Sequence, residues 1–227
     1  MSEARAVTRW PLDTNVRTVA IVGGTFDPPH RAHLAIARSA TEALGSGSGV
    51  VFVPAAVSPF KVGVAQTAAE HRLAMVRLAV AGETRWGVWS DEIDRAREGV
   101  PSYMVDTLER AAVATGGSVA MRLVMGADQA LRFHGWREFR RVLGMAAPLV
   151  LLRAPLGTVG ELRAGLEATG AWSGAELDAW CGWCVDAPLD AVSSTAVRDA
   201  VRGGVERARG MVDDRVLAYI GAHGLYR

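Results

Sequence analysis

The sequence has few cysteines, little net charge and no long apolar run. Among its 227 residues there are 2 cysteines, and 25 Lys and Arg against 24 Asp and Glu leave a formal net charge of +1. Such a balance creates no field that would attract a polyanion, so we expect no nucleic-acid partner. No segment reaches the roughly 18 uninterrupted apolar residues of a membrane-spanning helix, so we expect no membrane partner. Half of the residues are hydrophobic, which is enough for one sizeable core.

The first residues, 1–15, are polar and lack the apolar core of a secretory signal. We therefore expect a cytoplasmic protein whose residues 1–15 form a mobile tail. A single domain should follow over residues 16–227.

Cysteine chemistry is restricted to the pair in Cys181-Gly182-Trp183-Cys184. This spacing is typical of thioredoxin-like redox motifs, in which a helix begins at the first cysteine and lowers its pKa. Here a helical pattern runs into Cys181 and an extended segment follows Cys184, which is the reverse order. Two cysteines also cannot complete a four-ligand zinc site. We expect two buried, reduced thiols.

Short apolar segments alternate with helical patterns along the chain. The predicted strands are 18–22, 50–53, 86–89, 120–125, 149–152 and, more weakly, 183–186, with helices over 71–80 and 103–112. This alternation indicates βαβ units with right-handed crossovers. The predicted fold is therefore α/β, a Rossmann-like doubly wound and mostly parallel sheet with helices on both faces. Ligands of such sheets bind beyond the carboxyl ends of the strands.

The first predicted strand leads into a turn that is rich in glycine, proline and histidine. This turn reads Gly23-Gly24-Thr25-Phe26-Asp27-Pro28-Pro29-His30-Arg31-Ala32-His33. Glycines allow close approach of a ligand, and the N-terminus of the helix that follows attracts anions. His30 and His33 lie three residues apart and share a helix face. The turn is suited to a polyphosphate, although the two histidines alone would also fit a zinc pair or a solvated helix start.

A second cluster of hydroxyl groups, Ser193-Ser194-Thr195, lies near the end of the chain. Alone, these residues would be ordinary helix caps. Arg198 follows Ser194 by four residues and so lies one turn further on the same face. Hydroxyls, helix N–H groups and a guanidinium then converge on one point, which favours a phosphate. We predict that 190–227 is a helical segment that completes the site.

Together these segments resemble the nucleotidyltransferases that carry a His-x-Gly-His turn. The turn His30-Arg31-Ala32-His33 is similar to that motif, and Val192 to Arg198 resembles the family's Ile-Ser-Ser-Thr-x-x-Arg segment. Ser102 to Leu108, Gly126-Ala127-Asp128 with Trp136, and the C-terminal Gly224 to Arg227 resemble segments of the bacterial nicotinate-nucleotide adenylyltransferase family. The resemblance runs from about residue 18 to the end of the chain.

The resemblance implies transfer of the adenylyl group of ATP to nicotinate mononucleotide, which gives nicotinate adenine dinucleotide and pyrophosphate in NAD biosynthesis. It implies four catalytic residues: His30, His33, Lys61 and Arg198. ATP would be bound by Gly23, Gly24, Thr25, Phe26, Gly126, Asp128, Ser193, Ser194 and Thr195. The mononucleotide would be bound by Lys61, Tyr103, Met104, Thr107, Trp136 and Arg137. Magnesium would be the cofactor, held mainly by substrate phosphates, with no metal site made by the protein alone.

Three residues depart from the family pattern. Ala32 replaces a glycine, Phe60 replaces a histidine on the phosphate side, and Met104 replaces a threonine near the pyridine ring. Two alternatives therefore stay open: transfer to another acceptor, such as nicotinamide mononucleotide or phosphopantetheine, and a module that binds ATP without turnover. The sequence also leaves the oligomeric state open, a homo-oligomer included.

Overall fold

The computed structural model describes residues 7–58, 63, 65–96, 100–152, 156–186 and 192–227. The strands are β1 (Thr18–Gly24), β2 (Gly49–Pro54), β3 (Trp86–Val88), β4 (Ala120–Gly126), β5 (Ala146–Leu152) and β6 (Cys184–Asp186). The helices are α1 (Arg31–Leu44), α2 (Ala69–Val80), α3 (Asp91–Asp94), α4 (Met104–Ala114), α5 (Ala127–Arg132), α6 (Phe139–Met145), α7 (Val159–Ala168), α8 (Gly174–Gly182), α9 (Ser194–Arg202) and α10 (Asp214–His223), with 3-10 turns η2 (Phe133–Gly135) and η3 (Val205–Ala208). None of these described helices is both long and apolar enough to cross a membrane.

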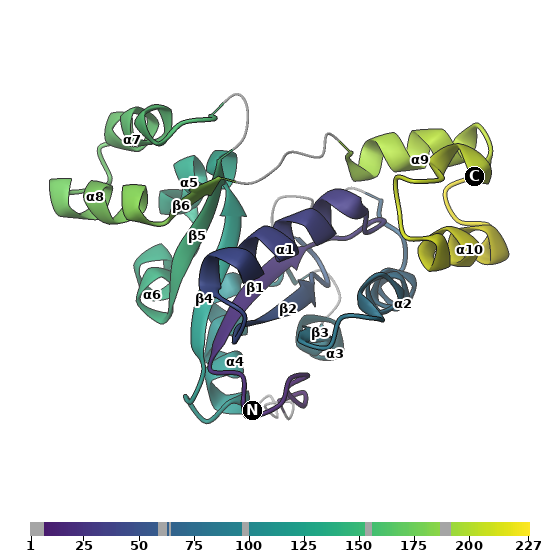
Figure 1. The fold of residues 1–227 in the computed structure, drawn as a ribbon, viewed down its shortest axis with the longest axis horizontal. Coiled ribbons are helices and arrows are strands. Elements are labelled where there is room, and N and C mark those ends of the chain that lie inside the picture. Colours follow the sequence, from purple (N-terminus) through teal and green to yellow (C-terminus); the bar gives the residue numbers. More distant parts are fainter. Residues whose placement is uncertain (1–6, 59–62, 64, 97–99, 153–155, 187–191) are drawn as a thin grey trace.

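The strands form one parallel sheet in the order β3-β2-β1-β4-β5-β6 (Figure 1). β1 pairs with β2 on one side and with β4 on the other. The predicted α/β, Rossmann-like doubly wound sheet is confirmed, and each predicted strand is present with ends that differ by a few residues. The chain order reverses between β1 and β4, which is the point where such sheets bind ligands at their carboxyl ends.

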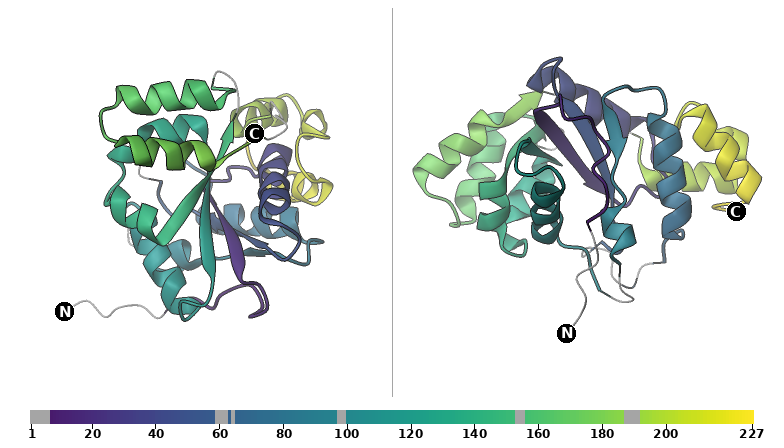
Figure 2. Two further views of the ribbon diagram at one scale, coloured as in Figure 1. Left: turned by 60° about the vertical axis from the view of Figure 1, so that its left-hand side comes forward. Right: turned by 90° about the horizontal axis from the view of Figure 1, so that it is seen from below.

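Helices cover both faces of the sheet, as predicted. Neighbouring residues of a strand point to opposite faces, so Val19 and Ile21 join one core with α4 to α8, whereas Ala20 and Val22 join another core with α1 and α2. Figure 2 shows these two helix groups on opposite sides of the sheet. The two apolar cores hold the strands rigidly, and the carboxyl ends of β1 and β4 are therefore fixed relative to each other.

The C-terminal helices α9 and α10 pack against α2 rather than against the sheet (Figure 1). Val197 of α9 and Val216 and Ile220 of α10 are buried in this third cluster, together with Met75 of α2. The backbone N–H of Arg31, at the start of α1, donates to the carbonyl of Met211 at 3.0 Å. This arrangement brings the end of the chain to the beginning of α1.

The N-terminal segment over residues 7–15 packs on the domain, where the sequence predicted a mobile tail. Glycines make room for it: a Cβ atom on Gly49 would lie 2.7 Å from the Leu12 side chain, and one on Gly87 would lie 2.8 Å from Pro11. The ring of Trp10 meets that of Trp89 edge-on, with centroids 5.2 Å apart. Composition alone did not indicate this docking, because the complementary surface comes from β2 and β3.

The cysteine pair lies at a helix-to-strand junction. Cys181 is in the last turn of α8 and Cys184 opens β6, so the helix precedes the first cysteine, as predicted. Both are free thiols, and both are half-buried rather than buried; Cys184 opens β6, which is an edge strand. Burial, with Cys181 and Asp186 nearby, raises the pKa of Cys184 to about 11. A raised pKa is the opposite of what a redox-active thiol requires.

Candidate functional site

The glycine-rich turn connects the carboxyl end of β1 to the start of α1. Its shape depends on Gly24, because a Cβ atom there would lie 3.0 Å from the ring of Phe26. Phe26 itself has a φ of 51°, in the left-handed region that costs a non-glycine residue free energy. The ring is buried against Phe52, with centroids 5.7 Å apart. The turn is thus held in a strained conformation by its packing, as is common at functional sites.

The two histidines share one face at the start of α1, as their spacing predicted. Their ring centroids are 3.8 Å apart. The backbone N–H of His30 donates to Nδ1 of His33 at 3.2 Å. Because Nδ1 accepts, the neutral imidazole of His33 carries its proton on Nε2. The ring of Phe26 meets His33 edge-on at 4.9 Å and limits its rotation.

Arg72 of α2 supports the turn from inside the protein. It is 1% exposed, and its Nη1 donates to the carbonyl oxygens of Thr25 at 2.8 Å and Ala55 at 2.7 Å. Its Nε donates to the carbonyl of Thr67 at 3.0 Å. We did not predict this residue from the sequence. A signal exists, however, because Arg72 precedes Met75 by three residues and so lies on the buried face of α2.

Asp27, a residue of the turn that we had not assigned to the site, is also buried. One carboxylate oxygen accepts a hydrogen bond from the hydroxyl of Tyr226 at 2.6 Å, and the other accepts from the backbone N–H of Thr67 at 3.1 Å. Burial alone would raise the pKa of Asp27, but these hydrogen bonds and the charge of Arg198 outweigh it and lower the pKa below its ordinary value. Asp27 is therefore an ionised group that organises the turn.

The second predicted segment, at the start of α9, meets the first turn. Ser193 caps the helix through its hydroxyl, which accepts from the N–H of Ala196 at 3.2 Å. The hydroxyl of Ser194 donates to the carbonyl of Pro28 at 3.0 Å. Nη1 of Arg198 donates to the carbonyl of Asp27 at 2.7 Å, and Nη2 donates to the Thr195 hydroxyl at 3.2 Å. The two segments that the sequence pointed to are thus in direct contact.

The other half of the candidate site lies at the carboxyl end of β4. Gly126 ends that strand and Asp128 lies in the first turn of α5, beside the point where β1 also ends. Met104, the first residue of α4, reaches this place as well. A Cβ atom on Gly23 would lie 3.1 Å from the terminal methyl of Met104. Met104, predicted for the mononucleotide, therefore lies beside Gly23, predicted for ATP.

Aromatic and cationic side chains border this half of the site. The guanidinium of Arg137 lies over the ring of Tyr103, 4.7 Å from its centroid. Trp136 is half-buried and packs against Phe133, with ring centroids 5.0 Å apart. Tyr103 and Arg137 thus come together across two segments, which their sequence positions alone did not indicate.

The position of Thr107 differs from the prediction. Its side chain is 1% exposed, and its hydroxyl donates to the carboxylate of Glu92 at 2.6 Å while accepting from Arg95 at 2.8 Å. This hydroxyl is therefore not available to a mononucleotide. The helical pattern of α4 explains the difference, because Thr107 lies on the same buried face as Leu108 and Ala111.

Thr107 belongs to a buried ionic network that the sequence did not reveal. Glu92 is almost fully buried, and burial raises its pKa even though Thr107, Arg95 and Ser102 stabilise the ionised form. Next to it, the carboxylate of Asp91 accepts from Arg110 at 2.6 and 2.7 Å. The backbone N–H of Thr8 in the docked N-terminal segment donates to the same carboxylate at 3.0 Å.

Lys61 and Phe60 lie outside the described residues, so the prediction for Lys61 has no structural outcome. In the part of the chain that is described, no three His, Cys, Asp or Glu side chains cluster as they would around a metal ion. Asp27 is the acid within the turn, and both of its oxygens already accept hydrogen bonds.

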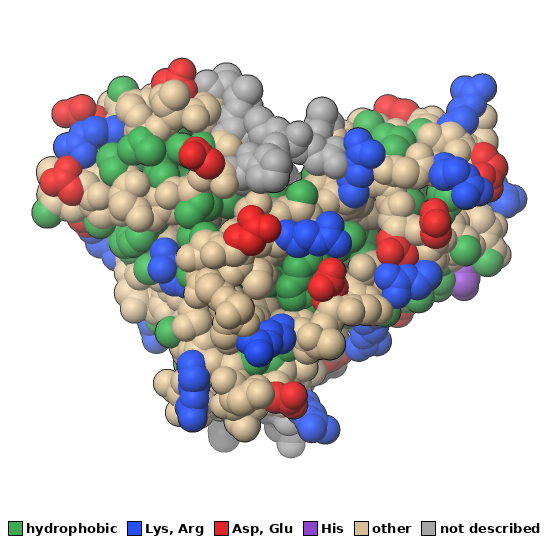
Figure 3. Space-filling model, in the orientation of Figure 1, with side chains coloured by type: hydrophobic (Ala, Val, Ile, Leu, Met, Phe, Trp, Pro, Cys, Tyr) green, Lys and Arg blue, Asp and Glu red, His purple; other side chains and the backbone are tan. Residues whose placement is uncertain are grey.

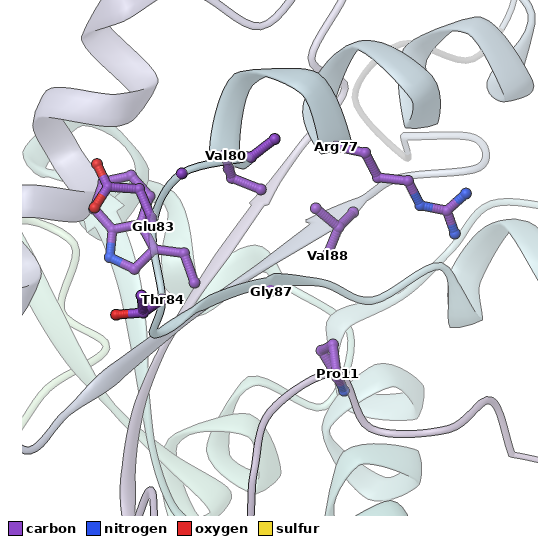
Figure 4. Close-up of a pocket in the computed structure, with 10 residues that line it drawn as sticks. Pro11, Arg77, Val80, Glu83, Thr84, Gly87 and Val88 are labelled. Carbon is purple, nitrogen blue, oxygen red and sulfur yellow. The ribbon is translucent and has the colours of Figure 1, made fainter.

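Two pockets, both lined in part by the N-terminal segment, lie away from the two turns. The first, of about 510 Å³, lies between Pro11, β3 and the end of α2 (Figure 4). The second, of about 740 Å³, is lined by residues of the segment itself and by the end of α4 and the loop that follows it. Neither contains a residue predicted for the site. The space-filling view shows basic and acidic side chains interspersed on one face, without a field of one sign (Figure 3).

The fold and the contact between its two turns define an α/β protein of the nucleotide-binding class. A family model described as cytidylyltransferase-like matches residues 21–200, which is most of the chain. The chain therefore belongs to the cytidylyltransferase-like family, and its curated relatives place it among the nicotinate-nucleotide adenylyltransferases.

These relatives are similar along nearly their whole length. A protein of Pseudomonas putida (strain W619) named as a probable nicotinate-nucleotide adenylyltransferase is 39% identical over 219 residues, which cover 93% of this chain and 96% of the relative. A protein of the same name from Gemmatimonas aurantiaca is 37% identical over 209 residues, with 92% of each chain covered.

A solved structure shares the fold at low sequence identity. The nicotinic acid mononucleotide adenylyltransferase of Plasmodium falciparum, complexed with NaAD, superposes with a TM-score of 0.66 at 14% identity, and 92% of this chain and 97% of that one are covered. The same enzyme complexed with APC gives a TM-score of 0.63.

Proposed function

We propose that this protein transfers the adenylyl group of ATP to nicotinate mononucleotide and releases pyrophosphate. The observation that carries the proposal is the contact of Ser194 and Arg198 with the histidine turn at the end of β1, the point where the sheet order reverses. The names of the curated relatives support it, as do the nucleotides bound to the structurally similar enzyme.

In this proposal the triphosphate of ATP lies at the start of α1. The proton on Nε2 of His33 would be donated in a hydrogen bond to a phosphate oxygen near the reacting phosphorus, with His30 beside it. Helix N–H groups at the start of α9 and the guanidinium of Arg198 would stabilise the leaving pyrophosphate. The protein needs no base, because the attacking phosphate of the mononucleotide is already largely ionised with a second pKa of about 6. Its task is to align two anions and to stabilise developing charge.

The acceptor would lie between the start of α4 and the residues that follow η2. The ring of Tyr103 and the half-buried Trp136 offer flat apolar surfaces to a pyridine ring. Arg137 would attract the carboxylate that distinguishes nicotinate from nicotinamide, and Lys61 would face the acceptor phosphate. Met104 offers no hydroxyl to that carboxylate, so any preference for the acid must come from backbone N–H groups and from Arg137.

Magnesium would enter with the substrate phosphates, because it dehydrates reluctantly and is often bound through phosphates and few carboxylates. Its chemistry would be to neutralise phosphate charge. The side chains of the protein itself would align the two substrates.

The test is release of pyrophosphate from ATP and magnesium with nicotinate mononucleotide, nicotinamide mononucleotide or phosphopantetheine as the acceptor. We expect turnover with nicotinate mononucleotide and a higher kcat/KM for it than for the amide, since an unpaired buried carboxylate or donor is costly. Turnover only with another acceptor would refute the substrate assignment. Binding of ATP without turnover of any acceptor would refute the enzymatic function and favour a nucleotide-binding module.

A further inference from the structure

The penultimate residue of the chain, Tyr226, is directed back into the protein by the way α10 ends. Gly224 has a φ of 60°, its N–H donates to the carbonyl of Gly221 at 3.3 Å, and the N–H of Leu225 donates to that of Ile220 at 3.1 Å. This pair of hydrogen bonds is a Schellman motif, which ends a helix and reverses the chain. Tyr226 then takes a φ of 64°, an unfavourable value for a residue with a side chain.

The hydroxyl of Tyr226 reaches the turn between β1 and α1. It donates to Oδ1 of Asp27 at 2.6 Å, a contact between residues 199 positions apart. Burial and the neighbouring Asp27 raise the pKa of Tyr226, so its hydroxyl stays a donor over the physiological range. The other charged groups that act on Asp27 are Arg198 of α9 and Arg72 of α2.

Asp27 is the middle of a chain of contacts that runs to the phosphate-binding turn. Its second carboxylate oxygen accepts from Thr67, whose carbonyl accepts from the buried Arg72, and Arg72 in turn donates to the carbonyl of Thr25. The carbonyl of Asp27 accepts from Arg198. A shift of Asp27 would therefore move the backbone on both sides of it.

We propose that Tyr226 is a positioning residue, whose hydroxyl fixes the Asp27 carboxylate and thereby holds residues 25–30 in the conformation that binds the triphosphate. This inference rests on the proposed function only in that the turn binds ATP. It does not depend on which acceptor is used. In this proposal the tyrosine acts through Asp27 and has no contact with either substrate.

The experiment compares Tyr226→Phe with Tyr219→Phe. Both changes remove one hydroxyl from the C-terminal region, and the hydroxyl of Tyr219 instead bonds to Nδ1 of His71 at 2.9 Å. Binding of ATP with magnesium is measured by calorimetry without an acceptor, and the folding of each variant is checked by thermal unfolding. We expect Tyr226→Phe to weaken ATP binding about tenfold, the loss typical of one hydrogen bond to a charged group. Tyr219→Phe should stay within about twofold of the unchanged protein.

A double-mutant cycle with Asp27→Asn separates positioning from general destabilisation. An Asn side chain has one acceptor oxygen and no charge, so removal of the Tyr226 hydroxyl should cost clearly less in that background. In steady state, the KM for ATP should rise in Tyr226→Phe. The KM for the mononucleotide should change less than about twofold, because sites that do not interact affect each other by only a few tenths of a kcal/mol.

Equal losses in the two Phe variants, or additive effects of Asp27→Asn and Tyr226→Phe, would overturn the inference. If the unchanged protein binds ATP but releases no pyrophosphate with any acceptor, the proposed function falls while the positioning role is still decided by the binding data. If it binds no ATP, both are wrong.

Discussion

The two halves of the candidate site are held together in different ways. The turn over residues 25–30 is fixed by contacts between residues far apart in the sequence, such as Ser194 with Pro28 at a separation of 166 and Tyr226 with Asp27 at 199. The second half, which includes the start of α4, is supported by the α3–α4 region mainly through nearer contacts, since Thr107 bonds to Glu92 at a separation of 15 and Arg110 to Asp91 at 19. The first half therefore needs the C-terminal helices, whereas the second depends mostly on α3 and α4, which the N-terminal segment joins through Thr8.

The two halves also differ in how they hold a buried acid. Hydrogen bonds and the charge of Arg198 keep the pKa of Asp27 below its ordinary value in spite of burial. For Glu92 burial prevails and the pKa is raised, although Thr107 and Arg95 oppose the shift. The turn is thus built around an ionised carboxylate, whereas the α3–α4 region holds one that is costly to ionise, Glu92, beside Asp91, whose pKa is lowered by Arg110 and Thr8 in spite of burial.

The largest effect should come from His33, the imidazole proposed to face the reacting phosphate. We expect His33→Ala to lower kcat by roughly two to four orders of magnitude, as for loss of a donor that acts in the transition state. Folding should persist, because His33 is only half-buried. Steady-state pyrophosphate release is the measurement, and His134→Ala, at an exposed histidine in η2, is the control. A normal kcat in His33→Ala would remove this residue from the mechanism.

The next largest effect should come from the guanidinium that joins α9 to the turn. Arg198 donates to both Asp27 and Thr195, and the single ammonium of a lysine cannot reproduce this planar arrangement. We expect Arg198→Lys to lower kcat/KM for ATP about 10- to 100-fold, equivalent to roughly 1.5–3 kcal/mol.

The matched control for this change is Arg202→Lys, one turn further along the same helix. Arg202 pairs with Asp199 on the exposed surface, where an ion pair contributes little. If the two lysine variants are equally active, the planar contacts of Arg198 do not matter for ATP.

The sequence predicted the sheet and the two turns because both depend on local patterns. Apolar runs mark β1 and β4, and Ser194 and Arg198 share a helix face by spacing alone. Asp27 and Tyr226 could not be paired in this way, since nothing in either segment indicates a partner 199 residues away. The prediction for Thr107 was wrong because the family resemblance indicated only that the segment around it borders the site. Which face of α4 its hydroxyl occupies depends on helix periodicity, and that periodicity places it on the buried face. The docking of Pro11 depends on Gly87 in β3, where a side chain would collide with it. The sequence does not indicate this contact, because the two residues become neighbours only in the folded sheet.

The buried acids should give opposite pH dependences of stability. A lowered pKa means that ionised Asp27 stabilises the folded state above the unfolded pKa of about 3.8, and this contribution is lost as the pH falls through the folded pKa. The stability advantage over Asp27→Asn should thus grow as the pH rises toward about 4 and then level, reaching about 1–3 kcal/mol. For Glu92 the raised pKa makes ionisation destabilising, so the advantage over Glu92→Gln should decrease as the pH rises above about 4.5.

Urea unfolding of the three proteins from about pH 3 to about pH 8 measures both trends. Parallel profiles for the two variants would mean that the two carboxylates have the same ionisation preference. The two halves of the site would then differ only in how far apart in the sequence their contacting residues lie.

The smallest effect should be seen in the choice between acid and amide. Arg137 is exposed, and its guanidinium lies 4.7 Å from the centroid of the Tyr103 ring, an interaction of roughly 0.5–1 kcal/mol at an exposed site. We expect Arg137→Ala to lower the ratio of kcat/KM for nicotinate mononucleotide over nicotinamide mononucleotide by about two- to fivefold, because a cation near the ring favours the carboxylate. Arg140→Ala is the control, since that arginine is also exposed, also covers an aromatic ring, Phe139 at 5.0 Å, and pairs with Glu176 as Arg137 pairs with Glu138. A ratio that falls equally in both variants would reflect general surface charge rather than recognition by Arg137. In that case the selectivity would depend on the backbone N–H groups at the start of α4, where Met104 replaces the family's threonine.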